Sequence, residues 1–286
     1  MTMELPALAL AFGVAWTPVT VPIPKAVPMG PVFAAPSVFD GTGAPGTWSV
    51  ALNDLATARI VAVGETHDSA MDHKVQAEVL TALAARTPRL AVAFEMVGFE
   101  DQAVLDSFMS GALSESGFAV WWKANWGFDF ALYKPIFDAA KAAGVPAYGL
   151  NAPIGLVRAV SKGGLSSLTA ADRIRLPFLI RESDDARYRS YVMDSVAGHG
   201  PLTPDQLKNR LEAMAVWNET MGEKAASIAA SGRTVLVIAG QGHVLYKAGI
   251  LESAARRGGG PVKVLLPMSA APQADELAYA DWFRVD

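Results

Sequence analysis

The sequence contains no cysteine, and this absence excludes several kinds of site at once. Disulfides, zinc–thiolate centres, thiolate-ligated haem and a cysteine nucleophile are all ruled out. Any metal would have to be bound by histidine, carboxylate, tyrosine or methionine side chains. Histidine is scarce as well, with four in 286 residues, so the position of each one is informative.

Charged residues are also few, at 18% of the chain against 51% hydrophobic residues. The net charge of −4 argues against nucleic acid as a partner. The sequence has no G-x-S-x-G nucleophile motif, no glycine-rich dinucleotide loop and no phosphate loop. The apolar composition instead predicts a large core and a surface that contacts a membrane or an apolar ligand.

The N-terminal segment has the composition of a leader. Leu5 to Trp16 form an apolar run as long as a signal-peptide core and too short to span a bilayer. Residues 17–46 are rich in proline and glycine and show no periodicity. We therefore assign residues 1–46 to a leader or flexible segment and residues 47–286 to one domain. The apolar run favours an exported protein, periplasmic or membrane-associated, and the alternative is a disordered or mis-started leader.

From residue 48 onward, apolar runs alternate with helical patterns. Strands are expected over 59–65, 90–96, 146–151, 234–239 and 262–267, with a further edge strand at 283–285. Helices are expected over 69–85, 100–143 and 154–231. Breaks are expected near Gly111, Gly117 and Gly127 in the second of these stretches, and at Gly163-Gly164 and 198–201 in the third. This order predicts an α/β domain with a central parallel or mixed sheet of about five or six strands. The two long helical insertions would cap the carboxyl ends of the strands.

Titratable residues stand where three of these strands end. Glu65 and His67 follow the first apolar run, Glu95 ends the second, and His243 follows the last long one. The carboxyl ends of parallel strands meet at the sheet edge where ligands bind, so these four side chains should converge. His73, in the helix after the first strand, should point toward the same place.

Three chemistries suit this cluster. Imidazole and carboxylate bind iron, zinc or manganese, so Glu65, His67, Glu95 and His243 are candidate ligands of a divalent metal. The same four residues are candidate catalytic groups if the cluster activates water by acid–base chemistry. A haem site is the third, because histidine or tyrosine can ligate haem iron.

Aromatic residues are concentrated between Phe118 and Tyr133, a segment that includes Trp126. They either pack a helical layer onto the sheet or form the wall of a large flat ligand or an oligomer interface. Tyr246 lies one turn after His243 and would share its face if a helix began there.

Several motifs together resemble one known family. These are Gly64–Asp68 (GETHD) with Asp72–Gln76 (DHKVQ), the strand ends FEM and AGQGHV, Trp126 with YKPI, GLNAP, and the helix AVWNETM. They resemble the ChaN-type haem-binding proteins of the superfamily that also holds Tiki, TraB and erythromycin-esterase-like proteins. The resemblance covers roughly residues 48–267. The lipoprotein cysteine usual in that family is absent.

The resemblance implies a function that composition alone does not. It implies a ChaN-type protein that binds haem as cofactor and partner and serves haem or iron uptake at the cell envelope. A homodimer and a membrane surface are further candidate partners. The candidate haem-binding residues are His67, His73, Trp126, Tyr133, His243 and Tyr246. Other branches of the superfamily are enzymes, so the alternative is a metal- or Glu/His-dependent hydrolase of a small ester or amide.

Overall fold

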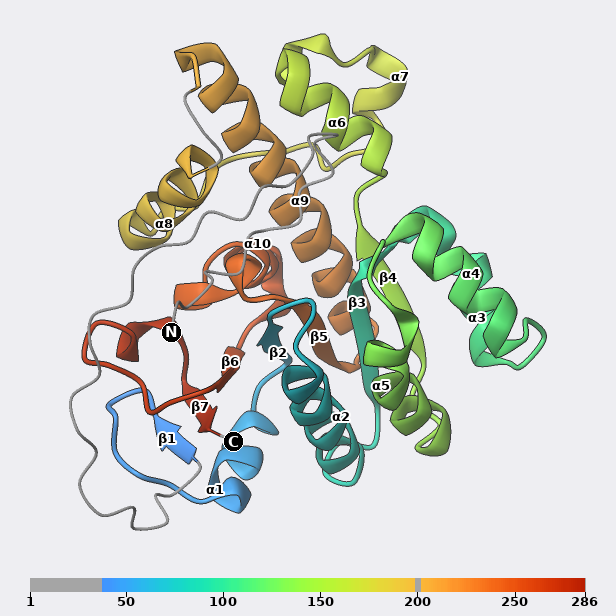
Figure 1. Cartoon of the computed structure of the whole chain (residues 1–286), viewed down its shortest axis with the longest axis vertical. Helices are drawn as coiled ribbons and strands as arrows, with labels where there is room; N and C mark the ends of the chain where they lie inside the picture. Colours follow the sequence, from blue (N-terminus) through green and yellow to red (C-terminus); the bar gives the residue numbers. More distant parts are fainter. Residues whose placement is uncertain (1–37, 199–201, 286) are drawn as a thin grey trace.

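The protein is built on a seven-stranded sheet, seen here in a computed structural model that describes residues 38–198 and 202–285. The strand order is β1-β7-β6-β2-β5-β3-β4 (Figure 1). The strands are β1 Val38–Asp40, β2 Ile60–Glu65, β3 Leu90–Gly98, β4 Ala147–Asn151, β5 Thr234–Gly240, β6 Val262–Met268 and β7 Trp282–Val285. Neighbouring strands are parallel except β1 and β7. The predicted α/β class with a parallel or mixed sheet is confirmed.

The three central strands are the apolar runs that end in polar residues. Every residue of β2 is buried, and β3 and β5 are buried along nearly their whole length. β5 lies between β2 and β3, with Val61 beside Leu236 and Ala91 beside Val235. This register brings the ends of the three strands to one edge of the sheet.

The sheet begins earlier in the chain than the sequence indicated. β1 pairs with β7, with Val38 opposite Arg284. Residues 38–46, which the composition placed in the leader segment, therefore belong to the folded body. The apolar run from Leu5 to Trp16 lies outside the described residues.

Helices connect the strands and cover both faces of the sheet. They are α1 Trp48–Leu55, α2 Ala70–Ala84, α3 Gln102–Met109, α4 Glu115–Asn125, α5 Phe130–Ala142, α6 Ile154–Gly163, α7 Ala170–Arg173, α8 Ala186–Ala197, α9 Pro204–Ala230 and α10 Ile250–Ala254. The predicted breaks at Gly111 and Gly127 occur, and both glycines have positive φ. The break predicted at Gly117 was wrong, because Ser114 caps the N-terminus of α4 and its hydroxyl accepts a hydrogen bond from the Gly117 N–H.

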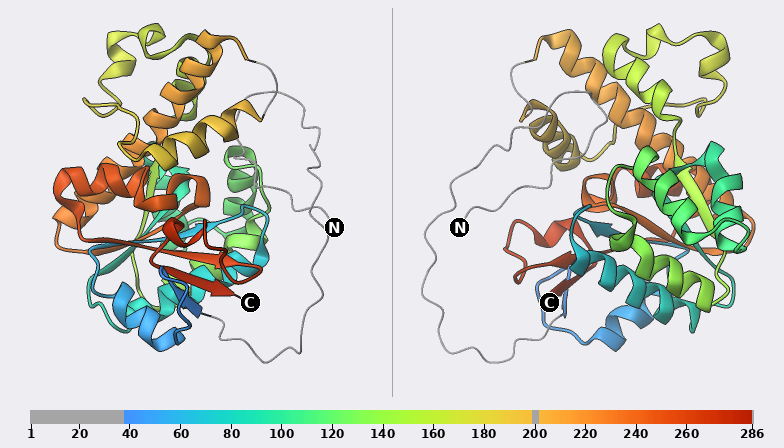
Figure 2. Two further views of the ribbon diagram at one scale, coloured as in Figure 1. Left: turned by 90° about the vertical axis from the view of Figure 1, so that its left-hand side faces the viewer. Right: turned by 45° about the vertical axis from the view of Figure 1, so that its right-hand side comes forward.

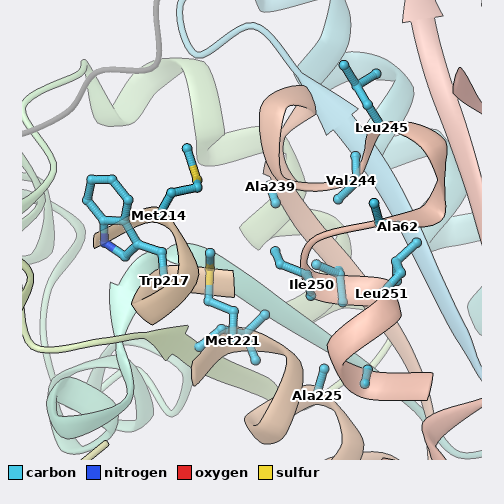
Figure 3. Packing of buried hydrophobic residues seen from close by; sticks show 14 of the residues in the cluster. Ala62, Met214, Trp217, Met221, Ala225, Ala239, Val244, Leu245, Ile250 and Leu251 are labelled. Carbon is cyan, nitrogen blue, oxygen red and sulfur yellow. The ribbon is translucent and has the colours of Figure 1, made fainter. Parts of the chain in front are cut away.

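The core has one layer on each side of the sheet. Helices α1 to α5 pack on one face, and α6, α8, α9 and α10 pack on the other. Figure 2 shows these layers from two further sides, and Figure 1 shows α6, α7, α8 and the first half of α9 lying beyond the sheet. In the second layer Met221 of α9 packs near Ile250 and Leu251 of α10 (Figure 3). Within the described ranges, no helix has the length and apolar character needed to cross a membrane.

Candidate functional site

Glu65 is the last residue of β2 and the centre of a buried polar cluster. Its side chain is shielded from solvent, with 2% of the residue exposed. Gln76 Nε2 donates to one carboxylate oxygen at 2.8 Å, and Tyr133 OH donates to the other at 2.6 Å. His67 Nδ1 lies 2.8 Å from the same oxygen as the tyrosine. Four elements thus hold this carboxylate: the end of β2, the turn after it, α2 and α5.

The charge of Glu65 is stabilised by its histidine neighbours. Burial raises the pKa of Glu65, but the hydrogen bond and positive charge of His67, together with the charge of His73, outweigh it and hold the pKa at about 2. Burial lowers the pKa of His67, but the hydrogen bond to Glu65 and the negative charge of Glu95 raise it above its ordinary value overall. The partners of Glu65 and His67 therefore favour the charged form of each side chain.

His73 approaches Glu65 from α2, as the sequence predicted. Its Nε2 lies 3.4 Å from a Glu65 carboxylate oxygen, and its ring packs 4.0 Å from the ring of Tyr133. The 3.4 Å contact lacks hydrogen-bond geometry. His73 is fully buried.

Glu95, near the end of β3, is the centre of a second group. One of its oxygens accepts from the Gly240 N–H at 2.6 Å, and the other lies 3.3 Å from His243 Nε2. His243 Nδ1 lies 2.7 Å from Asn218 Oδ1. An amide oxygen only accepts, so Nδ1 is the donor.

The chain of hydrogen bonds continues from Asn218 into helix α8. Asn218 Nδ2 donates to Tyr188 OH at 2.9 Å, and that hydroxyl donates to the Gly242 carbonyl at 2.8 Å. A line of hydrogen bonds, with one imidazole–carboxylate contact between His243 and Glu95, thus joins β3, α9, α8 and the segment after β5. The sequence alone indicates no role for Asn218, although it lies in the AVWNETM segment.

The two groups meet at Gly240, the last residue of β5. Gly240 lies beside Glu65 in the sheet register. A Cβ added at Gly240 would lie 2.7 Å from His67 Cε1, 3.1 Å from His67 Nε2 and 3.5 Å from Glu95 Oε2. The imidazole of His67 therefore packs onto bare backbone, which only glycine provides. The predicted convergence of Glu65, His67, Glu95 and His243 is present, and their functional roles stay predictions.

The aromatic segment divides between core and site. Phe118, Trp122 and Phe130 are buried in the layer formed by α3, α4 and α5. Trp126 and Phe128 are half-buried and lie over His67, with ring centroids 4.9 and 5.4 Å from its ring. They leave His67 only 7% exposed.

Tyr246 lies in a different conformation from the one expected. Two short 3-10 turns, Gln241–His243 and Leu245–Lys247, replace the helix on which it would have shared a face with His243. Tyr246 has φ of 62° and Lys247 has φ of 57°, two consecutive left-handed residues. The phenol is half-buried, 5.0 Å from the Tyr279 ring and 4.9 Å from the Arg187 guanidinium.

A metal site does not form from the four strand-end residues as they stand. Across residues 38–198 and 202–285, no group of three or more histidine and carboxylate side chains is arranged to hold a metal ion. Glu65 pairs with His67 and His73, and Glu95 pairs with His243. The carboxylates are engaged with imidazoles and backbone.

Comparison with known proteins identifies the family. Residues 51–253 match the family described as haem-binding uptake, Tiki superfamily, ChaN. The chain belongs to this ChaN family. No curated protein sequence matches the chain.

Two solved structures share the fold. A structure described as cofacial haem binding to ChaN of Campylobacter jejuni has 16% identity and a TM-score of 0.68, covering 87% of this chain and 95% of that one. The type III effector HopBA1 has 16% identity and a TM-score of 0.50, covering 82% of this chain and 90% of the effector. At such identities the likeness shows the fold alone.

Proposed function

We propose that the protein binds haem and that the phenol oxygen of Tyr246 ligates the iron. The family match supports haem as the ligand. The single structural observation that supports Tyr246 is its position: a half-buried tyrosine in a left-handed backbone conformation, directly after the strand-end segment that contains His243. Strained residues of this kind cluster at functional sites.

The surroundings of Tyr246 fit a haem group. A porphyrin is flat and apolar with two carboxylates, so its axial ligand must be reachable from outside and stand near cations. Tyr279 adds a second aromatic ring beside Tyr246, and the guanidinium of Arg187 lies over the Tyr246 ring. A tyrosine phenolate is an established haem ligand.

The other predicted ligands are less accessible than Tyr246. His73, Tyr133 and His243 are at most 1% exposed. His67 lies beneath Trp126 and Phe128, with Nδ1 engaged by Glu65 and Nε2 facing the Gly240 backbone. Burial raises the pKa of Tyr133 strongly, and the neighbouring Glu65 charge adds to this, so it remains a neutral phenol. In this conformation these four residues support the site rather than contact a porphyrin.

The second buried group supports the loop that contains Tyr246. Tyr188 OH donates to Gly242, and His243 is fixed between Glu95 and Asn218. A Cβ at Gly249, which has positive φ, would lie 2.4 Å from the His243 carbonyl oxygen and 2.8 Å from Tyr188 OH. The loop from Gln241 to Gly249 is therefore tightly packed on both sides, which fixes the backbone of Tyr246.

Titration of the protein with haem, followed in the Soret region, tests the assignment. Tyr246→Phe should lower haem affinity at least about tenfold and remove the charge-transfer band of phenolate ligation. Tyr148→Phe, a half-buried tyrosine on β4 at the far edge of the sheet, is the matched control and should bind as the wild type does. Unchanged binding and spectrum in Tyr246→Phe, together with loss in His67→Ala, would overturn the choice of ligand.

A second candidate function is hydrolysis with His67 as the general base. The observation that favours it is the orientation of the ring: Glu65 holds Nδ1, and Nε2 is turned toward the Gly240 backbone beside Glu95. The raised pKa of His67 means that its free base forms only as pH rises. Hydrolysis of p-nitrophenyl acetate should therefore increase with pH in the wild type and be lost in His67→Ala. Lys74→Ala, an exposed change on α2, is the control, and equal rates in all three proteins would exclude this function.

We further propose that haem binding serves uptake at the cell envelope and that two copies of the chain associate on loading. The family description supports uptake. The Campylobacter jejuni structure is described as cofacial haem binding to ChaN, and haem groups that face each other could each be held by a separate copy of the chain. Fractionation of cells that produce the full chain tests the location, and a cytoplasmic pool alone would contradict it. Light scattering with and without haem tests the association, and an unchanged monomer mass would contradict it.

A further inference from the structure

A cavity of about 340 Å³ lies between α8, α9 and α10, and Tyr246 is not among the residues that line it. Its walls come from α8, the middle of α9, the start of α10 and the segment just before α8. Tyr188 and Asn218 form part of its lining, and both already have hydrogen-bond partners. The volume is within the range of small-molecule sites, at its lower end.

One part of the lining is apolar and adaptable. Val192 and Met193 of α8 face Leu211 and Met214 of α9 across the cavity. Met193 is 47% exposed, which is unusual for a large apolar side chain and places it where a ligand would enter. Methionine side chains have three rotatable bonds and adapt to ligands of different shape.

The carboxylates around the cavity are already compensated. Glu219 pairs with Arg256 and with Arg257, the latter at 2.6 Å. Glu252 lies 3.7 Å from Arg256 Nη1 and also accepts hydrogen bonds from the Ser183 hydroxyl and the Asp184 N–H. These acids therefore add little net negative charge to the interior of the cavity.

One cation on the wall lacks such a partner. Arg189 Nη1 donates to the carbonyl oxygens of Ser183 and Asp184 at 2.7 and 2.8 Å. Its guanidinium forms no ion pair with a carboxylate of the described ranges, and no described residue accepts from its Nη2 or Nε. Arg181 pairs with Asp184, and the remaining acid of the lining, Glu182, is exposed. A half-buried guanidinium with free donors favours a carboxylate, which it can bind through two parallel hydrogen bonds.

We propose that this cavity binds a small amphipathic carboxylate, with its charged group on Arg189 and its apolar body between Met193 and Met214. This site is separate from the proposed haem site and does not depend on it. Positive charge at one end and a methionine-lined apolar wall at the other match that class of ligand, whereas a neutral or cationic molecule would leave Arg189 without a counter-charge.

Calorimetric titration with decanoate and with 1-decanol tests the proposal, because the two probes share the chain and differ in the charged group. The wild type should prefer decanoate. Arg189→Met keeps an apolar stem of similar length and should lower decanoate affinity about tenfold or more while leaving decanol affinity unchanged. Arg86→Met, an exposed arginine on the opposite layer, is the control and should bind as the wild type does.

Met193→Asp gives a second variant in case Arg189→Met fails to fold, since Met193 is largely exposed. The added negative charge should repel decanoate and leave the thermal unfolding midpoint unchanged. Equal affinity for the two probes in the wild type, or unchanged decanoate affinity in both variants, overturns the proposal. Loss of decanoate binding after addition of one equivalent of haem would assign the cavity to haem itself and also overturn it. Failure of the chain to bind haem would leave the decanoate result standing.

Discussion

Replacing Glu65 by Gln tests whether the strand-end cluster is an ionic network. Side chains of His67, Gln76 and Tyr133 all direct donors at the Glu65 carboxylate. A glutamine keeps the shape but offers one acceptor oxygen and one NH2 group, so at least one buried donor would face another donor. The loss of the charge pair and the unpaired donor together should cost about 2–4 kcal/mol of unfolding free energy.

The cost should depend on pH in a defined direction. The pKa of Glu65 lies at about 2 in the folded protein against an ordinary value of 4.5, a difference that corresponds to roughly 3 kcal/mol. Because the folded-state pKa is the lower one, this stability is fully present above pH 4.5 and is lost as pH falls toward 2. Linkage predicts that the wild type loses about 2 kcal/mol between pH 6 and pH 3 through this group, and that Glu65→Gln does not.

Urea unfolding at several pH values measures both effects. Glu78→Gln is the matched control, because Glu78 is a half-buried carboxylate on α2 whose ion pairs with Lys74 and Arg284 are long, at 4.0 and 3.8 Å. Its effect should stay under about 0.5 kcal/mol at every pH. A Glu65→Gln protein as stable as Glu78→Gln at pH 6, or a difference between them that does not shrink toward pH 3, would refute the ionic account of the cluster.

Two further predictions concern a glycine and an exposed apolar side chain. Gly240→Ala should lower the unfolding free energy measured in urea by about 1–3 kcal/mol, because its Cβ would lie 2.7 Å from His67 Cε1. Gly155→Ala is the control and should leave the unfolding free energy unchanged, because nothing lies within 4 Å of its Cβ. Equal stability of the two variants would contradict the packing of His67 on Gly240. Phe178→Ser should change the unfolding free energy by less than about 0.5 kcal/mol, because Phe178 is 97% exposed; a loss of more than about 1 kcal/mol in thermal or urea unfolding would show that Phe178 packs against the fold in solution.

The sequence predicted the centre of the sheet well because burial on both faces leaves a clear pattern. Long apolar runs that end in Glu65, Glu95 and Gly240 mark strands that have neighbours on both sides. β1 left no such pattern, since it has three residues and pairs along only one edge. An edge strand of that length becomes visible only when its partner is in place.

The sequence predicted which strand-end residues come together in the site, but not all of the hydrogen bonds that join them to other elements. Strand ends and parallel pairing brought together Glu65, His67, Glu95 and His243. The role of Asn218, in the middle of α9, depends on how α9 crosses the sheet, which no local pattern gives. The left-handed backbone conformation of Tyr246 could not be predicted from the sequence either. Tyrosine does not favour this conformation, and the surrounding contacts impose it.

Titration of the purified wild-type protein with haem at neutral pH tests the central claim most directly. The measurement is the Soret absorbance as a function of added haem. Binding by way of Tyr246 predicts a shifted Soret band that saturates at a defined ratio of haem to chain and the spectrum of phenolate-ligated ferric haem. A spectrum that stays that of free haem through a several-fold excess would contradict the haem assignment.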